Sequence, residues 1–377
     1  MRTNNELPAF AARLGKRISP AGECGETGEL SLSDAAFNLL ALELFEFQFE
    51  HNRPYRQFCE ARGVHPGLVE HWTSIPAVPT EGFKELELTS IPEAERTTVF
   101  HSSGTTGQTP SRHFHAQASL QLYESSLWSW FAPHLLAAGS IRPGWLLVLT
   151  PRGEEAPHSS LVHMFECIAS HLELDTVLFA GRVITGGGWE IEGGEVGRFL
   201  DSAASSGRPG LVLTTAFGLV QLSDLLAAEK RHFVLPTGSS MMETGGYKGR
   251  SRALPKAELH REITRRLGIH PASIVTEYGM SELSSQAYDH VAGNAVREGE
   301  RVFHFPPWAR ARLVSPETGA EVADGETGLI RVFDLANVFS VSAIQTGDLG
   351  IRRGDGFELI GRAERLEPRG CSLMAIT

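Results

Sequence analysis

The sequence has few cysteines and no long apolar run, and both absences narrow the class of protein. Its four cysteines (Cys24, Cys59, Cys167 and Cys371) are far apart and form no C-x-x-C pair. A disulfide framework or a zinc site is therefore not expected, and a reducing cytoplasm fits best. No stretch of about 18 apolar residues is present, so the sequence predicts no membrane span.

Two further features are also missing: a signal peptide and an excess of positive charge. The first residues, Met1 to Glu6, contain no apolar h-region. The 34 basic and 45 acidic residues give a net charge of −11. This charge argues against a protein that binds nucleic acid or anionic membranes in general, although a local basic pocket could still bind ATP.

The remaining sequence predicts an α/β fold. Apolar spacing indicates helices over residues 35–50, 53–62, 116–127, 159–171, 195–205, 217–229 and 256–267. Short apolar runs indicate strands over residues 98–100, 144–150, 176–180, 210–215 and 232–236. Because helices and continuous apolar strands alternate, we expect a mostly parallel sheet covered by helices. From about Phe303 the pattern changes to short strands and turns, which predicts a small β-rich subdomain.

The chain of 377 residues is long enough for two or three structural units. We expect a helical lead-in region over residues 1–100, of which residues 1–30 are rich in Gly, Glu and Pro and loosely structured. An α/β core should cover residues 101–300, and the β-rich subdomain residues 301–362. Residues 363–377 are expected to form a short tail.

One stretch, residues 101–111 (HSSGTTGQTPS), carries the strongest functional signal. A Ser/Thr/Gly-rich turn between a strand and a helix can hold phosphates, because glycines admit a close backbone and hydroxyl and N–H groups donate hydrogen bonds. It is not a Walker A loop, since no Gly-Lys-Ser/Thr follows. The alternative is an ordinary turn. The expected phosphate-binding residues are Ser102, Ser103, Gly104, Thr105, Thr106 and Gly107.

This stretch resembles the phosphate loop of adenylate-forming enzymes, S/T-S-G-T-T-G-x-P-K-G. Three later segments resemble motifs of the same superfamily, in the expected order. They are residues 277–282 (EYGMSE, like Y-G-x-T/S-E), 346–348 (TGD) and 361–362 (GR, like its hinge). The sequence departs from the family at residues 110–112, which are Pro-Ser-Arg in place of Pro-Lys-Gly. Any role that the family's lysine has as a cation would therefore belong to Arg112.

The resemblance implies a role for each matching residue. Tyr278 would stack on adenine, and Glu282 would hold Mg²⁺ as a hard carboxylate ligand. Asp348 would accept the ribose hydroxyls, and Arg362 would reach ribose or phosphate. Gly279, Met280 and Ser281 would complete the ATP-binding segment. The alternatives are a solvated glutamate at a helix end, a turn aspartate and a surface arginine.

Two more segments are candidates for the site. Residues 243–250 (ETGGYKGR) include Gly245 and Gly246, which would let the backbone lie flat against a base, and Lys248, which would act on phosphate in catalysis. The alternative is a mobile basic loop. The Thr-Gly-Gly-x-Lys pattern resembles the acyl-protein synthetases of bacterial luciferase operons. His158 could face the carboxylate of the acyl substrate, or be a plain loop histidine.

The C-terminal residues sharpen this resemblance. Full adenylate-forming ligases continue past the hinge into a domain with a catalytic lysine, whereas here no lysine follows Lys256. We therefore expect the full C-terminal lysine-bearing domain to be absent. The luciferase-operon synthetases share this shortness and carry an acyl-accepting cysteine near the end, where Cys371 fits. Arg365 or Arg369 could lower its pKa, since the thiolate is the nucleophile. The alternative is a small apolar residue packed at a chain end.

The sequence is thus identified as LuxE-like, within the adenylate-forming superfamily. This implies a cytoplasmic ligase that adenylates a carboxylic acid, expected to be a fatty acid, with ATP and Mg²⁺. The acyl group would pass to Cys371 and then to a partner such as an acyl reductase. One alternative enzyme transfers the acyl group to CoA, a carrier protein or an amine. Another alternative is an inactive nucleotide-binding regulatory or scaffold protein. Neither nucleic acid nor a membrane span is expected.

Overall fold

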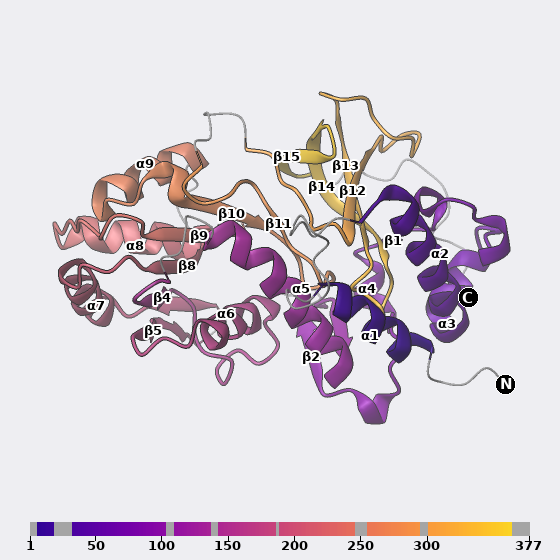
Figure 1. The fold of residues 1–377 in the computed structure, drawn as a ribbon, viewed down its shortest axis with the longest axis horizontal. Coiled ribbons are helices and arrows are strands. Elements are labelled where there is room, and N and C mark those ends of the chain that lie inside the picture. Colours follow the sequence, from indigo (N-terminus) through magenta and orange to yellow (C-terminus); the bar gives the residue numbers. More distant parts are fainter. Residues whose placement is uncertain are drawn as a thin grey trace.

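The computed structural model describes residues 6–18, 32–102, 109–136, 142–185, 188–245, 255–294 and 301–363. The α-helices are α1 (Glu6–Ile18), α2 (Asp34–His51), α3 (Arg53–Glu60), α4 (Gly82–Glu85), α5 (Gln117–Leu135), α6 (Ser160–Leu172), α7 (Gly193–Ser205), α8 (Ala216–Ala228) and α9 (Lys256–Leu267). Figure 1 shows α7, α8 and α9 at one end of the molecule and α2 and α3 at the other.

The larger sheet has the strand order β11-β10-β9-β8-β4-β5. Its strands are β4 (Leu146–Val148), β5 (Val177–Phe179), β8 (Leu211–Thr215), β9 (Ser240–Thr244), β10 (Ile274–Tyr278) and β11 (Ala287–Tyr288). Every pairing is parallel except that of β10 with β11. The predicted α/β fold with a mostly parallel sheet is therefore confirmed.

Helices cover both faces of this sheet. Leu147, Val212 and Met241 pack with apolar side chains of α7, α8 and α9. The alternate residues Val148 and Met242 pack with α5 and α6 on the opposite face. Strands buried on both sides need apolar residues at successive positions, which is why they were recognisable as continuous apolar runs.

The second sheet is antiparallel over most of its width and lies in the C-terminal part of the chain. It consists of β12 (Ala309–Val314), β13 (Thr327–Asp334), β14 (Ala343–Arg353) and β15 (Gly356–Arg362), and β1 (Val78–Pro79) joins β14 in parallel. The predicted β-rich texture after Phe303 is therefore present.

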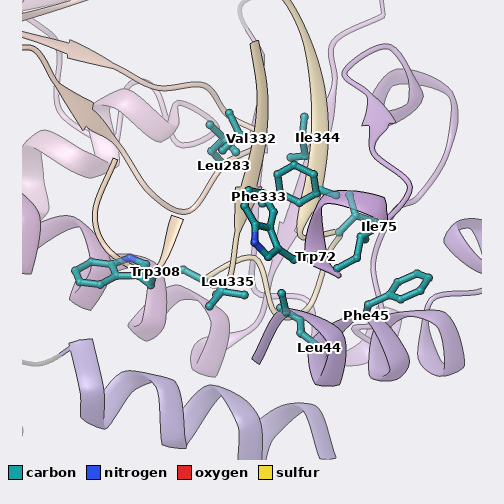
Figure 2. Close-up of a cluster of buried hydrophobic side chains, with 14 of the residues drawn as sticks. Leu44, Phe45, Trp72, Ile75, Leu283, Trp308, Val332, Phe333, Leu335 and Ile344 are labelled. Atoms are coloured by element: carbon teal, nitrogen blue, oxygen red, sulfur yellow. The ribbon is translucent and has the colours of Figure 1, made fainter. Parts of the chain in front are cut away.

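The N-terminal helices pack against this second sheet in one apolar cluster. Trp72 lies between α2 and β13, with its ring 5.3 Å from that of Phe37 and 4.7 Å from that of Phe333. Figure 2 shows Leu44 and Phe45 on one side of Trp72 and Phe333 above it. Leu283 belongs to the same cluster, so this core anchors the segment that contains the nucleotide motif.

Two expectations for the N-terminal third were wrong. Part of the region expected to be loose is the helix α1, which buries Leu7, Phe10 and Leu14. Its apolar face was obscured by the Gly, Glu and Pro residues that follow it. In addition, a second strand separates the phosphate-loop stretch from α5. The strands β2 (Thr98–His101) and β3 (Arg112–His115) form an antiparallel hairpin, so the stretch is a hairpin connection and does not lead directly into a helix.

The strand expected at residues 232–236 was also wrong. The backbone N–H groups of Phe233 and Leu235 donate to the last carbonyls of α9, at Arg266 and Leu267. These residues form an extended segment that packs on the helix end, with Val234 80% exposed. The strand of the sheet is β9, which the apolar pattern missed because Ser240, Glu243 and Thr244 are polar. Another small hairpin pairs β6 (Gly181–Val183) with β7 (Trp189–Ile191).

The other predicted helices and strands correspond to observed elements, with ends shifted by at most two residues. The exception is α5, which continues to Leu135, eight residues past its predicted end. Short 3-10 turns, η1 (Pro66–Leu68), η2 (Trp72–Ser74), η3 (Glu93–Glu95) and η4 (Pro271–Ser273), complete the described elements. None of the helices in the described ranges is long and apolar enough to cross a membrane.

Candidate active site

Tyr278 and Asp348 are in contact, although 70 residues separate them in sequence. Tyr278 ends β10, and its hydroxyl donates a hydrogen bond to Asp348 Oδ2 at 3.0 Å. The tyrosine ring meets the rings of Phe303, Phe305 and Phe357 edge-on. The contact joins the carboxyl end of the parallel sheet to β14, so two of the predicted nucleotide motifs meet at one place.

Arg362 completes this group from the neighbouring strand. In the β14–β15 ladder Asp348 is paired with Arg362, whose Nε lies 3.6 Å from Asp348 Oδ1. The arginine side chain is 88% exposed, whereas that of Asp348 is 17% exposed. Burial raises the pKa of Asp348, and the Tyr278 hydroxyl and the Arg362 charge oppose that rise. Asp348 is therefore oriented from within the protein and accessible on the side of Arg362.

Glu282 is buried, so the alternative of a solvated glutamate at a helix end does not hold. Its side chain is 5% exposed. Burial raises the pKa of the Glu282 carboxyl, while the Ser111 hydroxyl and the charges of Arg362 and Lys84 lower it. Ser111 is itself fully buried, and its hydroxyl lies beside the Glu282 carboxyl. Two buried oxygen-bearing side chains that meet in this way are of the kind that a hard cation takes as ligands.

The base of the phosphate loop lies against the Tyr278–Glu282 segment. Ser102 and Ser111 close the loop, because Ser111 N donates to Ser102 Oγ at 3.0 Å. Ser281 Oγ donates to the His101 carbonyl at 3.1 Å, and His113 Nδ1 lies 2.8 Å from the Ser281 carbonyl oxygen. The described ends of the predicted phosphate loop and the segment at residues 278–282 therefore share hydrogen bonds.

Met280 and Gly279 lie in the same segment with different surroundings. Met280 is partly buried and packs against the core that contains Leu283. A Cβ on Gly279 would clash with Glu277 Oε1, so only glycine fits there without movement. Gly245, after β9, adopts a φ of 70°, which glycine tolerates and most residues do not.

His158 lies beside His101, at the start of the predicted phosphate loop. Its ring stacks on that of His101 with centroids 4.6 Å apart, and its carbonyl oxygen accepts a hydrogen bond from His101 N. Arg112 faces His101 across the hairpin and forms an ion pair with Glu87 at 3.3 Å. The positive charge of Arg112 is thus already paired on its exposed side.

A buried polar network that sequence reasoning missed holds the Glu282 segment in place. Asp334, at the end of β13, accepts hydrogen bonds from Ser284 N at 2.9 Å and from Ser285 Oγ at 2.8 Å. Asn337 Nδ2 donates to the Glu282 carbonyl at 2.8 Å. Burial raises the pKa of Asp334 to about 6, and these donors oppose the rise. The only signal in the sequence is one acidic residue that ends an apolar strand.

The remaining predicted site residues lie outside the described residues. They are Ser103, Gly104, Thr105, Thr106, Gly107, Gly246, Lys248 and Cys371. Their predicted roles stay predictions.

The comparisons with known proteins agree with this geometry. The family model for acyl-protein synthetase, LuxE, matches residues 30–122 and 202–376. The chain belongs to this family. It is 22% identical over 352 residues to a long-chain-fatty-acid–luciferin-component ligase of Vibrio harveyi, covering 87% of this chain and 84% of that protein. A ligase of the same name from Aliivibrio fischeri is 37% identical over 79 residues, which are 19% of this chain. The predicted LuxE-like ligase is therefore confirmed at the level of the family.

The fold of this LuxE-family ligase resembles solved adenylate-forming ligases. The crystal structure of 2-hydroxyisobutyryl-CoA ligase, in an open conformation with 2-HIB-AMP and CoA, matches with a TM-score of 0.63 and 14% identity. The match covers 87% of this chain and 69% of the other. A second structure of that enzyme, in the postadenylation state with 2-HIB-AMP, gives a TM-score of 0.62 at 15% identity. The predicted adenylate-forming architecture is confirmed.

Proposed function

We propose that this LuxE-family ligase activates a carboxylic acid with ATP and transfers the acyl group to a protein thiol. The observation that carries the proposal is the hydrogen bond from Tyr278 to Asp348, beside Arg362 and next to the buried Glu282. It gathers three of the four nucleotide motifs at the carboxyl end of β10, the edge of a parallel sheet where ligands commonly bind.

The first step would join the acid to the nucleotide. A carboxylate oxygen attacks the α-phosphorus of ATP, the bond to the bridging oxygen breaks, and pyrophosphate leaves with the electron pair. Ser102 and the loop it closes would donate to the phosphates, while Asp348 would accept from the ribose hydroxyls. Since the Tyr278 hydroxyl already fixes one Asp348 oxygen, the other is oriented before ATP binds. The reaction requires that the protein groups around ATP are aligned in advance and reorganise little during the step.

Glu282 and Ser111 fit a Mg²⁺ ion, because both offer buried oxygen atoms and the Ser111 hydroxyl lies beside the Glu282 carboxyl. Mg²⁺ bound there would neutralise negative charge on the phosphates. Arg362 is exposed and in contact with Asp348, and it would approach the same phosphates.

In the second step a thiolate attacks the acyl carbon and AMP leaves. Cys371 is the proposed thiol, and the acyl group would then pass to a partner such as an acyl reductase. The relatives are named as long-chain fatty acid ligases, which supports a fatty acid as the acid. A cytoplasmic location would suit a reactive thiol.

Two measurements on one protein test the proposal. Acid-dependent exchange of radiolabelled pyrophosphate into ATP should occur with wild type and persist in Cys371→Ser. Intact-protein mass spectrometry should detect a hydroxylamine-labile acyl adduct in wild type that is lost in Cys371→Ser and kept in Cys59→Ser and Cys167→Ser. An adduct that persists in Cys371→Ser, or acyl-CoA formed without any adduct, would overturn the thiol step and favour transfer to CoA.

A further inference from the structure

A row of polar side chains crosses the face of the larger sheet that α5 covers. Thr244 ends β9, Glu277 lies beside it in β10, and Tyr288 faces Glu277 in β11. Residues paired across strands point to the same side of a sheet. The neighbouring positions on this side, Met242 and Val275, belong to an apolar cluster. The polar row thus interrupts an apolar surface at the carboxyl ends of β9 and β10.

Two side-chain oxygen atoms in and next to this row are buried without a hydrogen-bond partner among the described residues. Tyr288 is 1% exposed, and its hydroxyl has no hydrogen-bond partner within the described part of the chain. The same holds for Gln286 Oε1, on a side chain that is 5% exposed. Glu277 is 5% exposed, and the Thr244 hydroxyl donates to its Oε2. Burial raises the pKa of Glu277 to about 7, and Thr244 only partly offsets that rise.

Glu277 and Gln286 both lie beside Gly279, and Tyr288 is paired with Glu277 across the two strands. A Cβ on Gly279 would lie 3.5 Å from Gln286 Cγ and would overlap Glu277 Oε1. The negative charge of Glu277 also acts on Tyr288 and on Tyr123 of α5. A buried polar atom without a partner costs about 1–3 kcal/mol, so a group of them is expected where a ligand completes the hydrogen bonds.

We propose that Glu277, Gln286 and Tyr288 bind a hydroxyl group on the acid substrate, so that the enzyme prefers a hydroxylated carboxylic acid to its unsubstituted counterpart. The inference rests on the proposed adenylation and specifies its substrate class. A hydroxyl matches the row because it can donate to Gln286 Oε1 or Glu277 and accept from the Tyr288 hydroxyl. An ammonium group can only donate hydrogen bonds, so it would offer the Tyr288 hydroxyl no acceptor for its own proton.

The test is pyrophosphate exchange with straight-chain acids of increasing length, each compared with its hydroxylated and amino-substituted counterparts. We expect kcat/KM to favour the best hydroxylated acid by about 100-fold, because a site built around hydrogen bonds rejects an analogue that leaves them unmade. Equal kcat/KM for hydroxylated and unsubstituted acids would overturn the inference and leave adenylation intact. Preference for the amino acid counterpart would also overturn it. No exchange with any acid would overturn the proposed function itself.

Tyr288→Phe is the sharper variant, because it removes only one oxygen atom. Its preference for the hydroxylated acid should fall about 10-fold with little change for the unsubstituted acid. Its stability in urea should stay level or rise, since the lost hydroxyl has no hydrogen-bond partner among the described residues. A loss of stability with an unchanged preference would show a structural role and contradict the inference. Glu277→Leu should reduce the preference further, and Glu190→Gln, on the exposed part of β7, is the matched carboxylate control.

Discussion

Two buried glutamates on neighbouring strands of the larger sheet have opposite surroundings. Glu243 in β9 faces α9, where Lys256 Nζ and His260 Nε2 each lie 3.1 Å from its Oε1. Burial opposes its ionisation, but these two partners outweigh it and hold the pKa of Glu243 at about 2. Glu277 in β10 faces α5, has the Thr244 hydroxyl beside it, and its pKa is raised to about 7.

The difference fits a structural role for Glu243 and the proposed recognition role for Glu277. Glu243 is paired within the protein, so its charge contributes to holding α9 on the sheet. Burying Glu277 costs free energy, and the contacts on its own face of the sheet offset only part of that cost. Such groups persist where a ligand or reaction needs them, often at the expense of stability.

The largest effect on stability is expected at Asp334, a third buried carboxylate. Its hydrogen-bond donors are all uncharged. Asp334→Ala would leave Ser284 N, Ala336 N and Ser285 Oγ without their acceptor. We expect the free energy of unfolding to fall by about 3–4 kcal/mol, measured by urea denaturation. Asp334→Asn keeps one acceptor oxygen and should lose about half as much. Equal stability of all three proteins would show that the network contributes nothing.

Removing the cation beside Glu243 should have the next largest effect on stability. Lys256→Met leaves the buried carboxylate with His260, and we expect a loss of about 1–3 kcal/mol at neutral pH. This is less than for a fully buried pair, because the Lys256 side chain is 39% exposed. The pKa of Glu243 is lowered, so this contribution is present above the ordinary value of 4.5 and is lost as the pH falls toward 2. Lys230→Met, at an exposed lysine, is the control and should change little.

Asp348 lies between these two cases, since one oxygen is paired with Tyr278 and the other only loosely with Arg362. Asp348→Ala should weaken ATP binding by about 2 kcal/mol, the cost of a lost charge-assisted hydrogen bond. Calorimetry of ATP binding measures this change, and the urea midpoint checks that the fold is intact. The same ATP affinity in both proteins would reduce Asp348 to a turn residue.

Glu277→Gln should have the smallest effect on stability and the opposite sign. The native state keeps the Glu277 proton up to about pH 7, whereas the unfolded chain loses it near 4.5. Wild-type stability should therefore fall as the pH rises between these values, because the native state binds the extra proton. Glu277→Gln carries no such proton and should be more stable than wild type at pH 8 by roughly 1–2 kcal/mol. A glutamine variant that is less stable at pH 8 and equal at pH 4 would contradict the sign.

The sequence alone predicts the strands that are continuous apolar runs. It also predicts the motifs that contact each other in the structure. The sequence predicts Tyr278, Glu282, Asp348 and Arg362 as site residues, because each stands in a short motif with a recognisable neighbour such as Gly279 or Gly347. The hairpin strand β3 was missed because its residues, Arg-His-Phe-His, have no apolar alternation.

The surroundings of buried polar residues could not be predicted in the same way. Glu243 and Glu277 each begin a recognised segment, and nothing local distinguishes the glutamate that contacts a lysine from the one that contacts a threonine. Their difference depends on Lys256 and His260, which α9 brings to one face of the sheet. Asp334 likewise depends on donors about 50 residues away in sequence. Tertiary contacts of this kind have no periodic signature.

The central claim is that Glu282 and its neighbours form a site for adenylation, and acid-dependent pyrophosphate exchange by Glu282→Gln tests it most directly. The substitution keeps the shape of the side chain and removes the carboxylate that would hold Mg²⁺. We predict a fall in the exchange rate of about 100- to 1,000-fold, the usual effect of losing one strong electrostatic contact in a transition state. The Glu190→Gln control should exchange at the wild-type rate. A folded Glu282→Gln protein that exchanges pyrophosphate as fast as wild type would contradict the account.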